Sequence, residues 1–277
     1  MNDILKRIKF IYEYATHLQT DNSPPLELIY KFINELDKKE AKAIFHKFSK
    51  DKSSERIFNE EKAALDRLNE DEFKENTLGA EFKGWLKQSE GAVDLFKFGV
   101  FGRTEGKTKF KKFLKHTCLQ HDLIHFLNGY DVTPLGEVGV ITFNLAQEWR
   151  PSFATILYAS FLMSIRNTFL PSKYPANTQW HKAIKYSPLM VFCKVVREAW
   201  KRGKQSEWFL TVDWNGYLDT DLKQVKEKLK LENSPTYWDE VQPVWARALR
   251  HYKKYEKNKR ERQEDVAWLV TQVEWDF

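Results

Sequence analysis

The stretch HDLIHFLNGYDVTPLGE, residues 121–137, most constrains how this chain can fold. A helical period ends at Gly129 and a second one begins at Pro134, which predicts two helices joined by a short break. The first helix carries His121 and His125, whose spacing of four residues brings both imidazoles to one face. The fold must therefore accommodate two adjacent imidazoles on one helix.

The rest of the chain also favours helices. Its 277 residues are 42% apolar, enough for a substantial core, and 11 Gly and 9 Pro interrupt it sparingly. We expect helices over residues 1–18, 26–36, 39–50, 63–68, 75–86, 108–127, 133–149, 153–169, 190–201, 220–229 and 238–263. We expect a polar loop over 50–55 and a short strand or loop over 207–218. The prediction is an all-α, multi-helix domain over residues 1–235, followed by a basic amphipathic C-terminal extension over 236–277.

Two helix boundaries and one apolar stripe are specific enough to test. Asn76 or Thr77 is expected to cap the helix over 75–86, and Gly203 is expected to end the helix over 190–201. In the helix expected over residues 1–18, the apolar positions recur at a helical period and are Ile4, Ile8, Ile11, Tyr12 and Ala15.

A helical wheel of 100° per residue relates the polar side chains of residues 108–127. His125 lies about 40° and Asp122 about 100° from His121. The apolar stripe that we expect to be buried around His121 consists of Phe110, Leu114, Thr117 and Ile124. Both histidines should therefore lie within that stripe, with Asp122 at its edge. Glu137 follows the break, so it must come from the first turns of the next helix.

Two imidazoles with one or two carboxylates form a nitrogen and oxygen ligand set. Such a set suits zinc, and also iron, cobalt or manganese, and it disfavours calcium, which prefers oxygen ligands alone. The alternative is a pair of core histidines bonded to carbonyls and carboxylates. We favour the metal, because a cluster of four such residues is less common than a single buried histidine.

Charge and hydropathy limit the environment of the protein. The net charge of +6 comes from residues 243–262, which hold eight basic and two acidic side chains and leave 37 of each sign elsewhere. That concentration argues against a nucleic-acid partner, which needs a basic face.

The longest apolar run, Phe153–Ile165, falls short of the ~20 residues of a membrane span. Residues 1–10 do not resemble a signal peptide, and Cys118 and Cys193 fit buried thiols in a reducing compartment.

The basic segment also has an aromatic and aliphatic face, formed by Trp245, Leu249, Tyr252 and Tyr255. This pattern fits a helix at an anionic membrane surface, and equally a helix that packs on the domain by that face. We therefore expect a cytoplasmic protein, attached peripherally to the inner face of the cell membrane in the first case.

Several motifs together resemble the coenzyme Q biosynthesis protein four family. The central one is His-Asp-x-x-His, eleven residues and Glu, formed here by His121, Asp122, His125 and Glu137. The flanks HFLNGYDVTPLGEVGV, NTLGAEFKGWL, EAWKRGKQSEWFLTVDW and DLKQVKEKLKL are similar to family segments in the same order. The resemblance covers roughly residues 25–232.

The resemblance implies an all-helical fold, a metal that is usually zinc at those four residues, and peripheral attachment to the membrane that holds quinone precursors. It also implies removal of the C1 carboxylate from a polyprenylated 4-hydroxy-3-methoxybenzoate, with coupled C1 hydroxylation, and a role in organising other quinone-pathway enzymes. Two departures, the long basic tail and Asn144-Leu-Ala-Gln147 in place of an expected Phe-Glu pair, leave room for another prenylated aromatic substrate.

We therefore expect a metal-dependent decarboxylase of quinone biosynthesis, a carbon–carbon lyase, with no catalytic group assigned beyond the metal ligands. Arg166 is a candidate anchor for an anionic head group, and Phe153 and Phe98 are candidates for a prenyl groove together with Phe96 and Phe101. A salt-bridged arginine and ordinary core phenylalanines are the alternatives.

The expected partners are a prenylated quinone precursor or lipid, other quinone-pathway enzymes, an anionic membrane and a second copy of the chain. One alternative function is a non-catalytic lipid-binding scaffold. Another is a metal-dependent phosphohydrolase, which would need His116 and Asp213 as further ligands.

Overall fold

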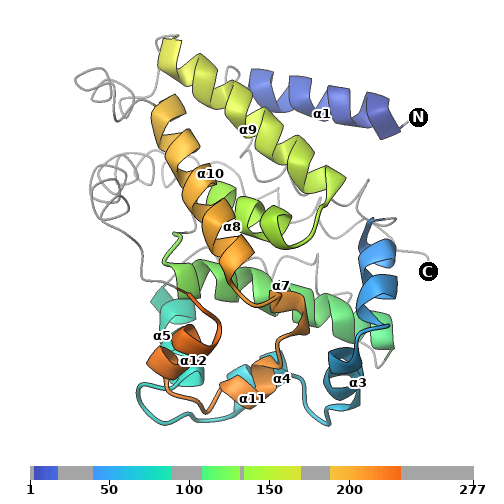
Figure 1. Ribbon diagram of the computed structural model, residues 1–277, viewed down its shortest axis with the longest axis vertical. Helices are drawn as coiled ribbons and strands as arrows, with labels where there is room; N and C mark the ends of the chain where they lie inside the picture. The colour runs from blue at the N-terminus through green and yellow to red at the C-terminus, as the bar shows by residue number, and fades with distance from the viewer. Residues whose placement is uncertain (1–2, 18–39, 89–107, 132–133, 170–187, 232–277) are drawn as a thin grey trace, which may run out of the picture. The chain divides into compact units, whose positions relative to one another are not determined.

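The computed structural model describes residues 3–17, 40–88, 108–131, 134–169 and 188–231 (Figure 1). Within these ranges every extended regular element is a helix, and the β-structure is confined to one isolated bridge between Thr77 and Asp221. The predicted all-α fold is confirmed. None of the helices in the described ranges has the length and apolar character needed to cross a membrane.

The contacts divide the chain into two compact units. Unit 1 comprises Met1–Asp51 and Thr133–Ser206, and unit 2 comprises Lys52–Val132 and Glu207–Phe277. Each unit is built from two separate stretches of chain, so neither is a contiguous sequence domain. The predicted boundary at residue 235, the helices over 26–36 and 238–263 and the loop after residue 169 lie outside the described residues.

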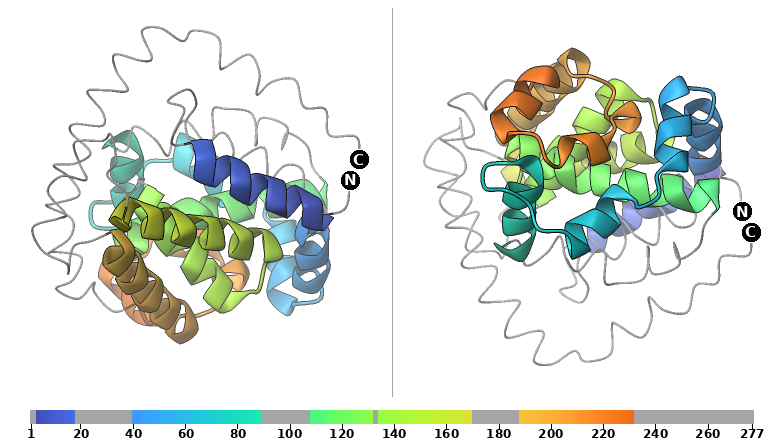
Figure 2. Two further views of the ribbon diagram at one scale, coloured as in Figure 1. Left: turned by 90° about the horizontal axis from the view of Figure 1, so that it is seen from above. Right: turned by 90° about the horizontal axis from the view of Figure 1, so that it is seen from below.

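Unit 1 is a group of packed helices in which α10 lies along α8, and α1 lies along α9 (Figures 1 and 2). Its elements are α1 Asp3–His17, a helix over residues 40–48, α8 Pro134–Gln147, α9 Pro151–Phe169 and α10 Pro188–Gln205. Their shared core is formed by Phe10, Tyr14, Ile141, Leu145, Ile156 and Ala159. The helices predicted over 39–50, 133–149 and 153–169 are confirmed within a few residues at their ends.

The N-terminal helix buries a different face from the one its apolar period indicates. Ile4, Ile8 and Tyr12 are 62%, 57% and 69% exposed, whereas Phe10 and Tyr14 are 4% exposed. The two rings bury more apolar area than the aliphatic side chains, and they also pack on each other with centroids 5.4 Å apart. The prediction of a helix is therefore confirmed. The predicted stripe is wrong at Ile4, Ile8 and Tyr12, whereas Ile11 is partly buried against the core.

Gly203 does not end its helix, because α10 continues to Gln205. A Cβ at Gly203 would lie 2.5 Å from the carbonyl oxygen of Phe143 and 2.8 Å from the Cβ of Ala146. The glycine is needed for the close approach of α10 to α8, and its predicted role as a helix end is wrong.

The free thiol of Cys193, also in α10, is exposed, which corrects the prediction that both cysteines are buried.

Unit 2 surrounds one long helix, α7, with shorter ones. Its elements are α3 Lys52–Asn59, α4 Ala64–Glu70, α5 Leu78–Gln88, α7 Lys109–Asn128, the 3-10 helix η5 Phe209–Thr211, α11 Trp214–Tyr217 and α12 Leu222–Lys228. The loop predicted over 50–55 is wrong: α3 begins at Lys52, because Ile57 and Phe58 are buried on its inner face. The strand considered for 207–218 is also wrong, since that segment forms η5 and α11.

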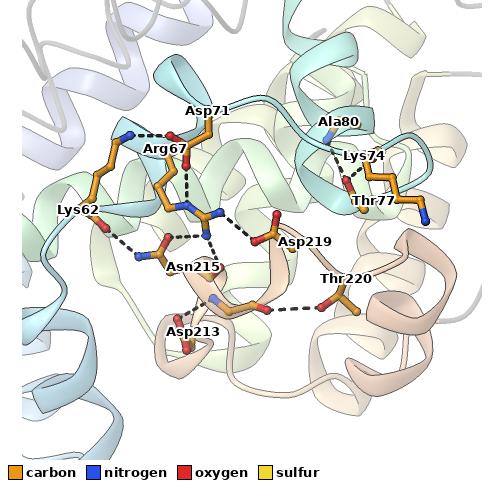
Figure 3. A network of polar contacts seen from close by, with 11 residues as sticks. Lys62, Arg67, Asp71, Lys74, Thr77, Ala80, Asp213, Asn215, Asp219 and Thr220 are labelled. Atoms are coloured by element: carbon orange, nitrogen blue, oxygen red, sulfur yellow. Dashed lines mark hydrogen bonds and ion pairs between the residues drawn. The ribbon is translucent and has the colours of Figure 1, made fainter.

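An arginine-centred network joins the two stretches of chain in unit 2 (Figure 3). From α4, the guanidinium of Arg67 donates to Asp71 at 2.8 Å, to Asp219 at 2.8 Å and to the carbonyl of Asn215 at 3.1 Å. Asn215 in turn donates to the carbonyl of Lys62 at 2.7 Å. The planar fork of arginine suits three acceptors in different directions, so Arg67 holds α11 against the region around α4.

Two glycine substitutions test the packing argument. Gly84 lies within α5, and a Cβ there meets no atom within 4 Å, so Gly84→Ala should stabilise the fold by about 0.5–1 kcal/mol. Gly203→Ala should destabilise it by about 1–3 kcal/mol, because α8 must move away from the added methyl. Denaturant unfolding of both variants measures the two effects. Equal stability of the two variants would contradict the close approach of α10 to α8.

Candidate metal centre

The helix that carries the histidine pair has defined ends. Thr108 caps its start by accepting the N–H of Lys111 at 3.3 Å. Gly129 ends it in the left-handed conformation, with φ of 72°, which glycine adopts without steric cost. The N–H of Tyr130 then donates back to the carbonyl of His125 at 2.9 Å. This turn brings the backbone of Tyr130 alongside the His125 side chain.

The ring of His125 is buried, at 1% exposure, and its orientation is held from two sides. Its Nδ1 lies 3.3 Å from the carbonyl oxygen of Tyr130. A carbonyl can only accept, so Nδ1 carries the proton, and Nε2 is left as the nitrogen with a lone pair. The indole of Trp85, from α5, lies nearly parallel to the ring with centroids 6.4 Å apart. Metal-binding histidines usually have such a second hydrogen bond.

His121 lies one turn before His125 and is half-buried. The two ring centroids are 5.0 Å apart at an interplanar angle of 72°, and the rings offer ligand nitrogens within 4.8 Å of each other. The predicted pairing of the imidazoles on one face of the helix is therefore present. The donor set, two imidazoles in a mostly buried setting, fits zinc or a similar divalent metal.

Asp122 is buried, at 2% exposure, and its neighbour is Cys118, one turn earlier on the same helix. Burial raises the pKa of the Cys118 thiol well above its usual value, and the negative charge of Asp122 raises it further. Asp122 therefore lies close to Cys118. Within the part of the chain that the structure describes, it is not among the side chains whose ligand atoms gather within 4.8 Å of the two imidazoles. Its role as a metal ligand stays a prediction.

The burial of α7 differs from the predicted stripe. Phe110, Leu114 and Thr117 are half-buried, as is His121. Ile124 is fully buried, as predicted, and the other deeply buried apolar positions are those of Phe113, Leu119, Leu123 and Leu127. Asp122 is more deeply buried than His121, not at an exposed edge. From Cys118 to Asn128 the helix is buried on most sides, so a helical wheel with one buried and one exposed face does not describe it.

Glu137 lies in the first turn of α8, as predicted, and is half-buried. It belongs to unit 1, whereas the two histidines belong to unit 2. Burial raises the pKa of Tyr14, a hydrogen bond with Ser160 lowers it, and the negative charge of Glu137 raises it. The carboxylate therefore lies near the Tyr14 hydroxyl, and its role as a metal ligand stays a prediction.

The structure describes two of the predicted substrate-binding residues, Phe153 and Arg166. Phe153 is half-buried against the core of unit 1, with the guanidinium of Arg150 4.3 Å from its ring centroid, which are the contacts of a core residue. Arg166 is half-buried in the last turn of α9. Phe98 lies outside the described residues, as do Phe96 and Phe101. Their roles towards a substrate stay predictions.

The two residues required by a phosphohydrolase have structural partners instead. His116 is buried, and its Nε2 lies 2.9 Å from the carbonyl oxygen of Leu210 in η5. Asp213 caps α11 by accepting the N–H of Gly216 at 3.1 Å, and it pairs with Arg56 at 3.0 Å.

Two residues that contact the His125 ring were not predicted from the sequence, Trp85 and Tyr130 through its carbonyl. Only the second had a signal, since it directly follows the helix-ending glycine.

The buried ring of His116 predicts a loss of stability in acid. Burial lowers its pKa from 6.5 to about 4, against a weaker rise from Leu210 and Asp213. Its contribution to stability is therefore present above pH 6.5 and is lost as the pH falls through about 4. His116→Gln, which keeps an N–H donor, should remove roughly 3 kcal/mol of that pH dependence. Unfolding at pH 7 and pH 4 measures it, with His46→Gln as an exposed control; an unchanged pH dependence in His116→Gln would contradict this.

Comparisons with known proteins identify the family. Residues 38–235, more than half of the chain, match the model of the family described as "Coenzyme Q (ubiquinone) biosynthesis protein Coq4". A crystal structure of a candidate ubiquinone biosynthesis protein from Nostoc punctiforme has a similar fold, with a TM-score of 0.52 and 18% identity, over 83% of this chain and 97% of that one. No curated protein matches the chain. The match over residues 38–235 is consistent with the motifs at the histidine pair, and the chain belongs to the Coq4 family of coenzyme Q biosynthesis proteins.

Proposed function

We propose that this member of the Coq4 family is a metal-dependent enzyme that removes the C1 carboxylate from a polyprenylated 4-hydroxy-3-methoxybenzoate or a related prenylated aromatic acid. Membership of the family supports a role in coenzyme Q biosynthesis. The observation that carries the metal-dependent part is the orientation of His125. Its Nδ1 bonds to the Tyr130 carbonyl, and its Nε2 shares a helix face with His121.

In this proposal His121, His125 and Glu137 hold the metal, with Asp122 as a fourth ligand or as a buried negative charge beside it. The motif supports the participation of Glu137. It follows His125 after eleven residues, the spacing of the motif that resembles the family, and the family match covers all four residues. Zinc is the first choice for this ligand set, and iron, cobalt or manganese are compatible with it.

Decarboxylation breaks the bond between C1 and the carboxylate, releases CO₂ and leaves an electron pair on the ring carbon, which must then take up a proton. A bound metal would supply Lewis acidity towards an oxygen of the aromatic head group. The residues of this chain orient the ligands: the Tyr130 carbonyl and Trp85 hold the ring of His125, and the buried surroundings limit access of water. Arg166 is proposed to bind the carboxylate of the substrate, and Phe153 and Phe98 to line a groove for its tail.

Elemental analysis tests the metal. The full-length protein, purified without chelators, should contain close to one equivalent of a divalent metal. His125→Ala should lose most of it, because one of the two imidazole ligands is gone. His46→Ala should retain it, since His46 is exposed in the helix over 40–48 and serves as a matched control. Metal-free wild-type protein, or equal metal in both variants, would refute the proposed site.

Release of CO₂ from a prenylated hydroxybenzoate tests the reaction. Metal-loaded wild-type protein should release it, and His125→Ala should be slower by at least about 100-fold if the metal is essential. Binding of the prenylated acid to the metal-loaded protein without CO₂ release would instead favour the alternative, a lipid-binding scaffold for other quinone-pathway enzymes.

Attachment to an anionic membrane is proposed for the basic residues 243–262, which lie outside the described residues. Full-length protein should float with liposomes that contain anionic lipid, and it should float less with neutral liposomes or at high salt, because salt screens the attraction. A chain ending at residue 235 should lose this flotation. Equal flotation of the shortened chain would remove the basic segment from the proposal.

A further inference from the structure

Unit 2 contains a small cavity away from the histidine pair, between the α3–α4 connection, α7 and α11. Its volume is about 20 Å³, which exceeds the minimum of roughly 10–15 Å³ for one water molecule and excludes an organic ligand. The polar side chains that line it are Glu60, Lys112, Lys115, His116, Trp214 and Asn215. The cavity is therefore both polar enough and large enough for a single small molecule.

Trp214 supplies the strongest reason to expect an occupant. It is among the largest fully buried side chains, at 1% exposure, and its ring packs edge-on against Phe209 with centroids 5.2 Å apart. The indole nitrogen can only donate a hydrogen bond. Among the residues that the structure describes, none offers an acceptor to this N–H, which is buried. Buried donors in native proteins are nearly always paired with protein or with water.

The other polar groups of the cavity are held in place by protein contacts. Lys112 donates through its Nζ to the backbone carbonyls of Phe58 and Glu60, and Asn215 donates to Lys62. His116 donates from Nε2 to Leu210, so Nδ1 is the acceptor nitrogen of that ring. These contacts position donors and an acceptor around the cavity.

Glu60 adds a group that can both donate and accept near neutral pH. The pKa of its carboxyl group is raised to about 7, first by burial and then by the negative charge of Asp213 and a hydrogen bond to it; a hydrogen bond to Asn215 and the charge of Lys112 partly offset this rise. A neutral carboxylic acid offers one O–H and one acceptor oxygen. Two to four such partners are what a buried water needs.

We propose that this cavity is a binding site for one ordered water molecule, which accepts the indole N–H of Trp214 and connects α11 to the polar side chains of Glu60 and α7. Lys112 and the indole N–H make the cavity unsuitable for a cation, and its size excludes larger anions. The water joins the two stretches of chain that form unit 2, since Trp214 belongs to the second and Glu60 to the first.

The wild-type protein gives the direct test. In full-length protein with ¹⁵N-labelled tryptophan, the indole proton of Trp214 should show a cross-relaxation signal to water with the sign of a residence time longer than nanoseconds. A crystal structure at high resolution should show a water oxygen within about 3.2 Å of Nε1. The absence of both the long-lived signal and the density would overturn the proposal.

A substitution that removes only the N–H gives the second test. Replacing Trp214 with 3-(benzothien-3-yl)alanine keeps the two-ring shape and exchanges the N–H for sulfur. The water should then lose the hydrogen bond donated by the indole N–H, and we expect Tm to fall by about 2–4 °C. The same replacement at Trp200, which is 41% exposed, is the matched control and should shift Tm by less than about 1 °C. An unchanged or raised Tm for the Trp214 replacement would overturn the proposal.

Discussion

The closing turn of α7 is the feature on which the candidate site depends. The left-handed conformation of Gly129 allows the N–H of Tyr130 to reach the His125 carbonyl and its own carbonyl to reach the His125 ring. One glycine thus ends the helix and selects which nitrogen of the imidazole carries the proton. A side chain with a Cβ at this position would disfavour that conformation, and the orientation of the ring would no longer be determined by the backbone.

The surroundings of α7 explain how polar residues can be tolerated in its buried half. His116 bonds to the Leu210 carbonyl, Asn128 bonds to the Ile124 carbonyl, and the His125 ring bonds to Tyr130. In each case a backbone carbonyl satisfies a side-chain donor, which greatly reduces the cost of burying it. The same helix also contributes Phe113, Leu119 and Leu123 to the core of unit 2. It is therefore both the centre of that unit and the helix that carries three of the four candidate metal ligands.

Helix existence could be predicted from the sequence, whereas several details of packing could not. The helical period and Gly129 predicted both ends of α7 closely, because the residues that cap it, Thr108 and Gly129, act locally. Gly203 was misread, since the same residue type serves a helix end and a close helix contact, and only the position of Phe143 distinguishes them. The buried face of α1 depends on the core of α9, which no local pattern contains. The histidine pair was recognisable from spacing, but its hydrogen bond to Tyr130 required the turn geometry.

The interleaved division of the chain has a consequence for its synthesis. The stretch Lys52–Val132, which includes the histidine pair, emerges from the ribosome before Glu207–Phe277 supplies η5, α11 and α12. Until then Arg67 lacks its acceptors Asn215 and Asp219, and α7 lacks the contacts that η5 supplies. Unit 1 likewise cannot close before α10 is made. The nascent chain therefore exposes much of the future core of both units until residues 188–231 have been made, so we expect its folding in the cell to depend on protection from aggregation.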